Sequence, residues 1–322
     1  MNTQYLRATL AMAAFAAGTA AAQTFPSKVV RLVVPFAAGG SNDVVARAMS
    51  KPLSQALGQS VVVENRAGAN TIIGTEAVAR APADGHTVLI SGFTLMSLAA
   101  LRSNLPFDPL KDLVAVTRIG TQPYLFSVHP SLPVKSVKEL VALARARPGQ
   151  LVYSINGYGT GQHLSGELLK VKTGIDMKHV AFSGGGPATV AVLGGHASIL
   201  ISTVPPATQH IQAGRLRPLA VTSRERSILL KDTPTMIEAA GIPDFDLAGA
   251  MGVFAPSATP KEAVERLSSE IIRVVQMPDV NAGMLRDGFV VAPLGPAEYD
   301  AFMRNKIREI QAIAKAAKIK LD

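Results

Sequence analysis

The feature that most limits the fold of this chain is a repeated unit: a short β-branched strand, a glycine-rich turn, then an amphipathic helix. The first unit places a strand at 28–35 and a turn at 36–43, and apolar residues at helical spacing continue to Leu57. Strands predicted at 60–63 and 86–91 alternate with helices in the same way. This β-α-β-α-β order predicts an α/β layer with a mainly parallel sheet.

A second set of alternating strands and helices follows the polar segment 101–112. Its first elements are strands predicted at 113–119 and 124–128, broken by Gln122 and Pro123, and a helix predicted at 137–146. Two of its turns are again rich in glycine, 156–161 and 183–187. The C-terminal tail ends in a helix predicted at 298–318, whose apolar stripe we expect to be core. The tail is too short for a third domain, so we expect two lobes, with the tail returning to complete the first. The predicted boundaries are 1–22 for a leader, 23–122 with 249–322 for lobe 1, and 123–248 for lobe 2.

The first 22 residues have the features of an export signal. Arg7 is the only charge among them, an apolar run follows at 10–17, and small residues lead up to Ala22. A membrane-spanning helix needs about 20 apolar residues, so a cleaved signal is favoured over a membrane anchor. We expect cleavage after about Ala22, with Gln23 first in the mature chain, and a soluble product without a lipid anchor.

Composition excludes several classes of protein. Apolar residues make up 48% of the chain, enough for a sizeable core, which excludes wholesale disorder. Cysteine is absent, which removes disulfides, cysteine zinc sites and cysteine nucleophiles. The net charge of +9 is spread along a chain with only 5% aromatic residues, so small-anion attraction is favoured over nucleic-acid binding.

Motifs for catalysis and cofactor binding are missing. No Walker A or G-x-S-x-G sequence is present, and the glycines do not match the dinucleotide spacing. The six histidines are scattered without a metal-ligand pattern, so we expect neither a metal nor a cofactor. His163 begins a predicted helix beside a glycine turn, where a structural hydrogen bond is favoured over acid–base catalysis.

The glycine turns are the best candidates for a binding site. In open parallel sheets, ligands bind beyond the carboxyl ends of the strands, where helices begin. Glycine allows close approach of the backbone, free N–H groups and the helix dipole attract an anion, and Ser41, Asn42 and Thr160 add short polar groups. The alternative is that these residues only cap their helices. The residues alone leave both possibilities open.

Several segments together resemble one family. They are 28–43 (KVVRLVVPFAAGGSND), 58–68 (GQSVVVENRAG), 82–85 (PADG), 129–139 (HPSLPVKSVKE), 162–167 (QHLSGE), 220–223 (AVTS) and 231–235 (KDTPT). In this order they resemble the Bug-type solute receptors of tripartite tricarboxylate transporters. The resemblance implies a monomeric periplasmic binding protein of two lobes, of the Venus-flytrap, type II-like kind, that closes on a small mono- or dicarboxylate without a cofactor.

The resemblance also implies partners and contacts. The membrane subunits of such a transporter would receive the ligand. The alternatives are a ligand-presenting partner of a membrane sensor kinase and an exported enzyme that uses His163 or Asp43. The implied ligand contacts are Phe36, Gly40, Ser41, Asn42, Asp43 and Thr94 in lobe 1, and Asn156, Thr160, His163, Gly184, Gly185, Ser202 and Thr203 in lobe 2.

This chain departs from the family pattern at three places. Asn70 and Thr71 stand where the family often has Gly-Gly, and 182–184 reads Phe-Ser-Gly where Tyr-Lys-Gly is common. An acidic residue common near 202–203 is missing. Without that lysine and that acid, a neutral-bodied acid is favoured over an amino acid.

Overall fold

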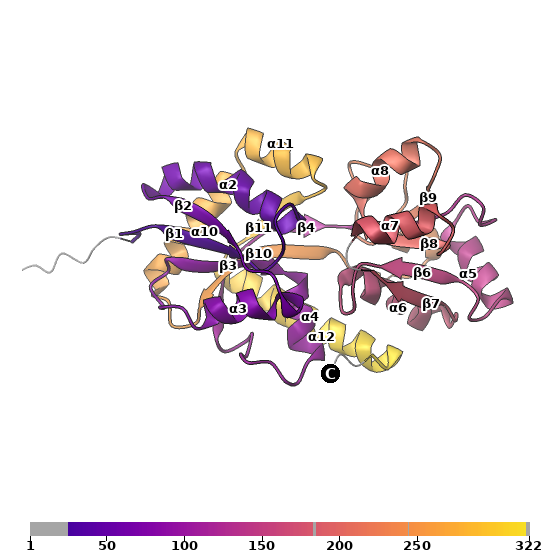
Figure 1. The fold of residues 1–322 in the computed structure, drawn as a ribbon, viewed down its shortest axis with the longest axis horizontal. Helices are drawn as coiled ribbons and strands as arrows, with labels where there is room; N and C mark the ends of the chain where they lie inside the picture. The colour runs from indigo at the N-terminus through magenta and orange to yellow at the C-terminus, as the bar shows by residue number, and fades with distance from the viewer. Residues whose placement is uncertain (1–24, 183–184, 244, 320–322) are drawn as a thin grey trace, which may run out of the picture.

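The computed structural model describes residues 25–182, 185–243 and 245–319. They form two α/β lobes that lie side by side, each built on its own sheet with helices around it (Figure 1). The two-lobe α/β architecture predicted from the sequence is confirmed. The predicted leader and its cleavage site lie outside the described residues.

Lobe 1 contains a six-stranded sheet in the order β11-β4-β10-β3-β1-β2. Its strands are β1 (Val30–Val34), β2 (Val61–Asn65), β3 (Thr87–Gly92), β4 (Leu113–Gln122), β10 (Gly249–Pro256) and β11 (Val290–Leu294). Its helices are α2 (Ser41–Leu57), the 3-10 turn η1 (Ala69–Thr71), α3 (Ile72–Ala79), α4 (Phe93–Leu101), α10 (Lys261–Val275) and α11 (Pro278–Arg286). The apolar side of α2, with Val45, Met49 and Leu53, is fully buried in the core of this lobe.

Lobe 2 contains a five-stranded sheet in the order β7-β6-β8-β5-β9. Its strands are β5 (Tyr124–Val128), β6 (Val152–Ile155), β7 (Lys178–Ala181), β8 (Ile199–Thr203) and β9 (Arg217–Val221). Its helices are α5 (Val137–Ala146), α6 (Gly161–Thr173), α7 (Gly185–Leu193), α8 (Val204–Gln212) and α9 (Met236–Ala240). The chain passes from one sheet to the other at Pro123, and returns between β9 and β10.

Both sheets are mixed, whereas the sequence predicted mainly parallel ones. Strand β1 runs parallel to β2 and β3, and β6 runs parallel to β7 and β8. Strands β5 and β10 are antiparallel to their neighbours. These two strands enter a lobe from the other lobe, so they run away from the junction while the strands of the βα units run toward it.

The last helix, α12 (Pro296–Ala317), belongs to both lobes. It contacts β4 and α4 of lobe 1 and α6 of lobe 2 (Figure 1). The predicted apolar stripe is core, as expected, with Tyr299, Met303 and Ile310 almost completely buried. A helix fixed to both lobes restricts how far they can separate on that side.

Candidate functional site

A cleft of about 680 Å³ lies between the lobes. Its walls are the ends of strands and the beginnings of helices from both lobes, together with the segments that cross between them. The described residues that line it include no Asp, Glu, Lys, Arg or His. Any charge on a ligand must therefore be stabilised by backbone groups and neutral side chains.

Five of the described helices begin at this cleft. Helices α2 and α4 reach it from lobe 1, and α6, α7 and α8 from lobe 2. No side chain caps the first turn of α2, α4 or α8, which leaves backbone N–H groups of α2 and α4 without that partner. Prolines in the first turn of α8 reduce its N–H donors. Because helix N-termini carry partial positive charge, their convergence favours an anion in the cleft.

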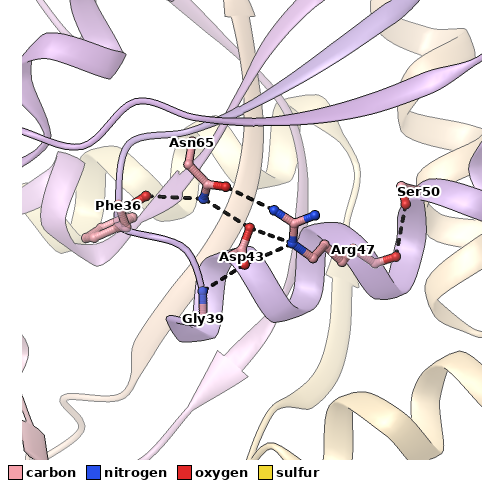
Figure 2. A network of polar contacts seen from close by, with 6 residues as sticks. All are labelled: Phe36, Gly39, Asp43, Arg47, Ser50 and Asn65. Atoms are coloured by element: carbon pink, nitrogen blue, oxygen red, sulfur yellow. Dashed lines mark hydrogen bonds and ion pairs between the residues drawn. The ribbon is translucent and has the colours of Figure 1, made fainter.

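The turn before α2 is held by the carboxylate of Asp43. Its Oδ2 accepts the N–H of Gly39 at 2.8 Å, and both oxygens accept the Nε of Arg47 at 3.0 Å (Figure 2). Asn65 Nδ2 donates to Asp43 Oδ1 at 3.0 Å and to the Phe36 carbonyl at 3.2 Å (Figure 2). The hydrogen bond from Arg47 is the main reason why the pKa of Asp43 falls to about 2. Asp43 thus shapes the turn, and it does not line the cleft.

The turn before α6 presents Asn156 and Thr160 to the cleft. Gly157 and Gly159 have φ values of 134° and 71°, which side chains rarely adopt. Thr160 Oγ1 donates to the Gly157 carbonyl at 2.8 Å and accepts the backbone N–H of His163 at 3.4 Å. Thr160 therefore caps α6 and faces the cleft at the same time.

His163 lies behind this turn rather than in the cleft. It is 2% exposed, and its Nδ1 accepts the N–H of Gly159 at 3.2 Å. Burial, reinforced by the neighbouring His179, lowers the pKa of His163 to about 4. The ring is therefore neutral at neutral pH and serves as a hydrogen-bond acceptor.

The described side chains that could together hold a metal are His163, Glu167 and His179, whose ligand atoms lie within 4.8 Å of one another. Glu167 Oε1 already accepts the Tyr153 hydroxyl at 2.6 Å and pairs with Lys170 Nζ at 3.0 Å. Burial alone would raise the pKa of Glu167, but hydrogen bonds from His179, Tyr153 and Lys170 outweigh it and lower the pKa to about 2. The Glu167 Oε1 atom is thus already bound by the Tyr153 hydroxyl and the Lys170 ammonium.

The crossing segment supplies residues that the sequence did not indicate. Gln122 and Tyr124 line the cleft on either side of Pro123. Gln122 Nε2 donates to the Asp287 carbonyl at 3.0 Å, and the Tyr124 ring meets Phe93 edge to face at 6.2 Å. The predicted break between two strands at 122–123 was the one signal that pointed to this position.

A strained turn reaches the cleft from lobe 1. Ala69, Asn70 and Thr71 have φ values of 45°, 52° and 76°, a left-handed conformation that favours glycine. Asn70 lines the cleft. This is where the sequence departs from Gly-Gly, so the chain holds an Asn side chain at the cleft at a cost in backbone strain.

Most of the predicted contacts meet in the cleft. Those that line it are Phe36, Gly40, Ser41, Asn42, Thr94, Asn156, Thr160, Gly185, Ser202 and Thr203. Asp43 and His163 do not line it, because each is buried behind a turn whose backbone it binds. Gly184 lies outside the described residues.

Comparisons with known proteins identify the family. The family model described as tripartite tricarboxylate transporter family receptor matches residues 45–319. The chain belongs to this family. It is 34% identical to Protein BugT of Bordetella pertussis over 326 residues, which covers 100% of both chains. Receptors of this family are periplasmic and bind solutes.

Solved structures of other proteins are similar to this chain over most of its length. An R. palustris protein with adipate superposes with a TM-score of 0.81 at 34% identity, over 92% of this chain and 99% of that one. MatC from Rhodopseudomonas palustris with bound malate gives 0.77 at 29% identity, over 90% and 99%. This receptor is thus a solute-binding protein and not an enzyme, as predicted. None of the helices among the described residues is long and apolar enough to cross a membrane.

Proposed function

We propose that this receptor captures a small organic mono- or dicarboxylate between its lobes and delivers it to the membrane subunits of a tripartite tricarboxylate transporter. The observation that carries this proposal is the convergence of five helix N-termini on a cleft lined by uncharged side chains. Such a cleft attracts an anion through backbone donors and offers no fixed charge to a cation.

The residues that line the cleft also limit the chemical class of ligand that can bind. An amino acid carries an ammonium group, which needs a negatively charged partner when it is buried. The described lining of the cleft contains neither Asp nor Glu. A carboxylate can be held by N–H groups at the starts of α2 and α4 and by the Ser41 hydroxyl. The relatives solved with adipate and malate support the same class. We therefore favour an acid without an amino group.

Ligand capture requires the two lobes to close on the acid. In proteins of this architecture, hinge closure surrounds the ligand and excludes water. The ligand stabilises the closed form by its higher affinity for that form. We place the hinge at the segments that cross between the lobes, 122–124 and 247–249.

A thermal-shift screen tests the ligand class. A ligand that binds only the folded protein raises Tm by mass action, by an amount that grows with its concentration. Adipate, malate, benzoate and hexanoate would be compared with their uncharged amides, and a nucleotide and a sugar would be included. We expect at least one acid to raise Tm while its amide does not. A shift with the nucleotide or the sugar alone would contradict the proposal.

Two substitutions test the predicted contacts. Ser41→Ala should weaken binding of the acid found in the screen by about 10-fold, as expected for a lost hydrogen bond to a charged group. Thr160→Ala should weaken it as well, because the cleft-facing turn loses its bond to the Gly157 carbonyl and α6 loses its cap. Ser269 and Thr173 offer matched controls, because their hydroxyls bond only within α10 and α6, away from the cleft. Unchanged affinity in both cleft variants would remove them from the site.

Delivery and localisation need tests in cells. We expect the periplasmic product to begin at Gln23, which intact-mass measurement would show, and to be monomeric in size-exclusion chromatography. Deletion of the gene should abolish uptake of the labelled acid. Uptake that persists while transcription no longer responds to the acid would favour the sensor-kinase partner.

A further inference from the structure

The backbone of Gly159 is held on both of its polar groups, the carbonyl and the N–H. On one side, the Ser97 hydroxyl donates to the Gly159 carbonyl at 2.6 Å in a buried contact. On the other, the Gly159 N–H donates to His163 Nδ1 at 3.2 Å. Ser97 lies on α4 of lobe 1 and Gly159 on the turn before α6 of lobe 2, so the first bond joins the lobes.

This turn has little preference of its own for the observed shape. Gly157 and Gly159 both adopt positive φ, and glycine loses more conformational freedom on ordering than any other residue. The bond from Thr160 to the Gly157 carbonyl holds one side of the turn, and Gly159 is held by bonds from outside it. Ser97 is 2% exposed, and no other donor to the Gly159 carbonyl is seen among the described residues.

Ser97 does not line the cleft, but the residues beside the bonded peptide do. Asn156, Thr160 and Gly161 all face the cleft from this turn and the start of α6. We propose that Ser97 is a positioning residue: through the Gly159 carbonyl, lobe 1 holds the ligand-facing turn of lobe 2 in the geometry that binds the ligand. The part of this inference that concerns affinity rests on the proposed function.

The position of Ser97 fits this assignment. Helix α4 begins at the cleft with Phe93, whose ring meets Tyr124 of the crossing segment edge to face. Ser97 lies one turn further along the same helix. The helix thus contacts the crossing segment with one residue and the ligand-facing turn with the next residue on the same side.

Hydrogen exchange of the unliganded protein tests the positioning directly. In Ser97→Ala, amides of 156–161 should exchange about 10-fold faster than in the wild type, because the carbonyl that anchors the turn has lost its donor. Ser97→Cys, a weaker donor of similar size, should lie between the two. Exchange at 156–161 that is unchanged in both folded variants would overturn the proposal.

Ser154 provides the matched control. It is 0% exposed, and its hydroxyl donates to the Ile199 carbonyl at 3.4 Å within lobe 2. Ser154→Ala removes a buried serine hydroxyl without touching the contact between the lobes. It should leave exchange at 156–161 as in the wild type, and equal acceleration in both variants would mean a general loosening and overturn the proposal.

Calorimetry with adipate and malate as probes tests the consequence for binding. Ser97→Ala should weaken the binding of whichever probe the wild type binds by about 10-fold, which corresponds to about 1.4 kcal/mol, mainly through faster dissociation. Equal affinity in variant and wild type would overturn the role in binding. If the wild type binds neither these acids nor any other in the screen, the proposed function fails, whereas the exchange result still decides whether Ser97 positions the turn.

Discussion

The ring of Tyr124 lies directly against the Cα of Gly161, so closely that a Cβ on Gly161 would overlap it. From the other side, a Cβ on Gly249 would lie 2.6 Å from the Tyr124 hydroxyl oxygen. The tyrosine of the first crossing segment is thus packed between the start of α6 and the start of β10. All three residues line the cleft. Gly161 and Gly249 have no positive φ, so these positions require glycine for its small size and not for its backbone freedom.

We expect Gly161→Ala to destabilise the protein by about 1–3 kcal/mol, because the added methyl group must displace the Tyr124 ring. Denaturant unfolding would measure the loss, and the affinity for the acid should fall with it. Gly283→Ala in α11 is the control: its Cβ would make only an ordinary van der Waals contact with the Arg286 side chain, and alanine favours a helix by up to about 1 kcal/mol. A Gly161→Ala protein as stable as the wild type would contradict the packing argument.

Asp43→Ala should cost about 1–3 kcal/mol, because the Gly39 N–H and the Arg47 guanidinium lose their acceptor. The pKa of Asp43 is lowered from 3.8 to about 2 in the folded protein. Its contribution to the free energy of unfolding is therefore fully present above pH 3.8 and lost as the pH falls through about 2. Urea unfolding at neutral pH and near pH 3 would show a smaller difference between variant and wild type at the lower pH.

Asp300→Ala is the matched control for the ion pair. Asp300 and Arg304 are also an aspartate and an arginine four residues apart on a helix, but both side chains are exposed. Such surface pairs contribute about 0.3–0.5 kcal/mol. If the variant at Asp300 lost as much free energy of unfolding as Asp43→Ala, the contribution of Asp43 to stability would not come from the turn before α2.

The buried neutral ring of His163 should make the protein sensitive to mild acid. Its pKa is about 4 in the folded protein against 6.5 for the free side chain. The unfolded chain therefore takes up a proton first, so the contribution of His163 to the free energy of unfolding is constant above pH 6.5 and falls between pH 6.5 and 4. His163→Asn, which keeps an acceptor near Nδ1, should flatten this slope in unfolding titrations, whereas the same change at exposed His196 should not. Equal slopes in all three proteins would contradict the prediction.

Relief of strain at the turn 69–71 should stabilise the protein. Ala69 is exposed with φ of 45°, so Ala69→Gly should raise the free energy of unfolding by about 0.5–1 kcal/mol. Ala282→Gly on the exposed side of α11 makes the same chemical change in a right-handed helix and should lower it by about 1 kcal/mol. Changes of the same sign in both variants would contradict the role of backbone strain.

Local sequence signals predicted most of the elements that obey a simple pattern. The strands at 113–119 and 124–128 and the helix at 137–146 appear nearly as expected. Helices α4, α8 and α11 were missed for identifiable reasons. Helix α4 is apolar at seven of its nine positions and so lacks a helical period, while α8 and α11 carry prolines that are tolerated only in a first turn.

Residues that line the cleft could be predicted from the sequence where a glycine-rich turn comes directly before a helix. Those junctions led to Ser41, Asn42 and Thr160, which line the cleft. Phe289 lines it as well, but it carries no local signal, because an aromatic residue beside a strand is usually core. Asp43 and His163 were expected to touch the ligand; each forms hydrogen bonds within its own turn and is not among the residues that line the cleft.

The sequence by itself determined the alternation of strands and helices, the glycine turns at the helix starts and, through its ordered segments, the family. These properties depend on neighbours a few residues apart, where backbone propensity and helix polarity act. The tertiary structure decided the mixed sheets, the placement of α12 across both lobes, and the contact of Ser97 with Gly159. Contacts of that kind join residues far apart in the chain, and only the packing of the two lobes brings them together.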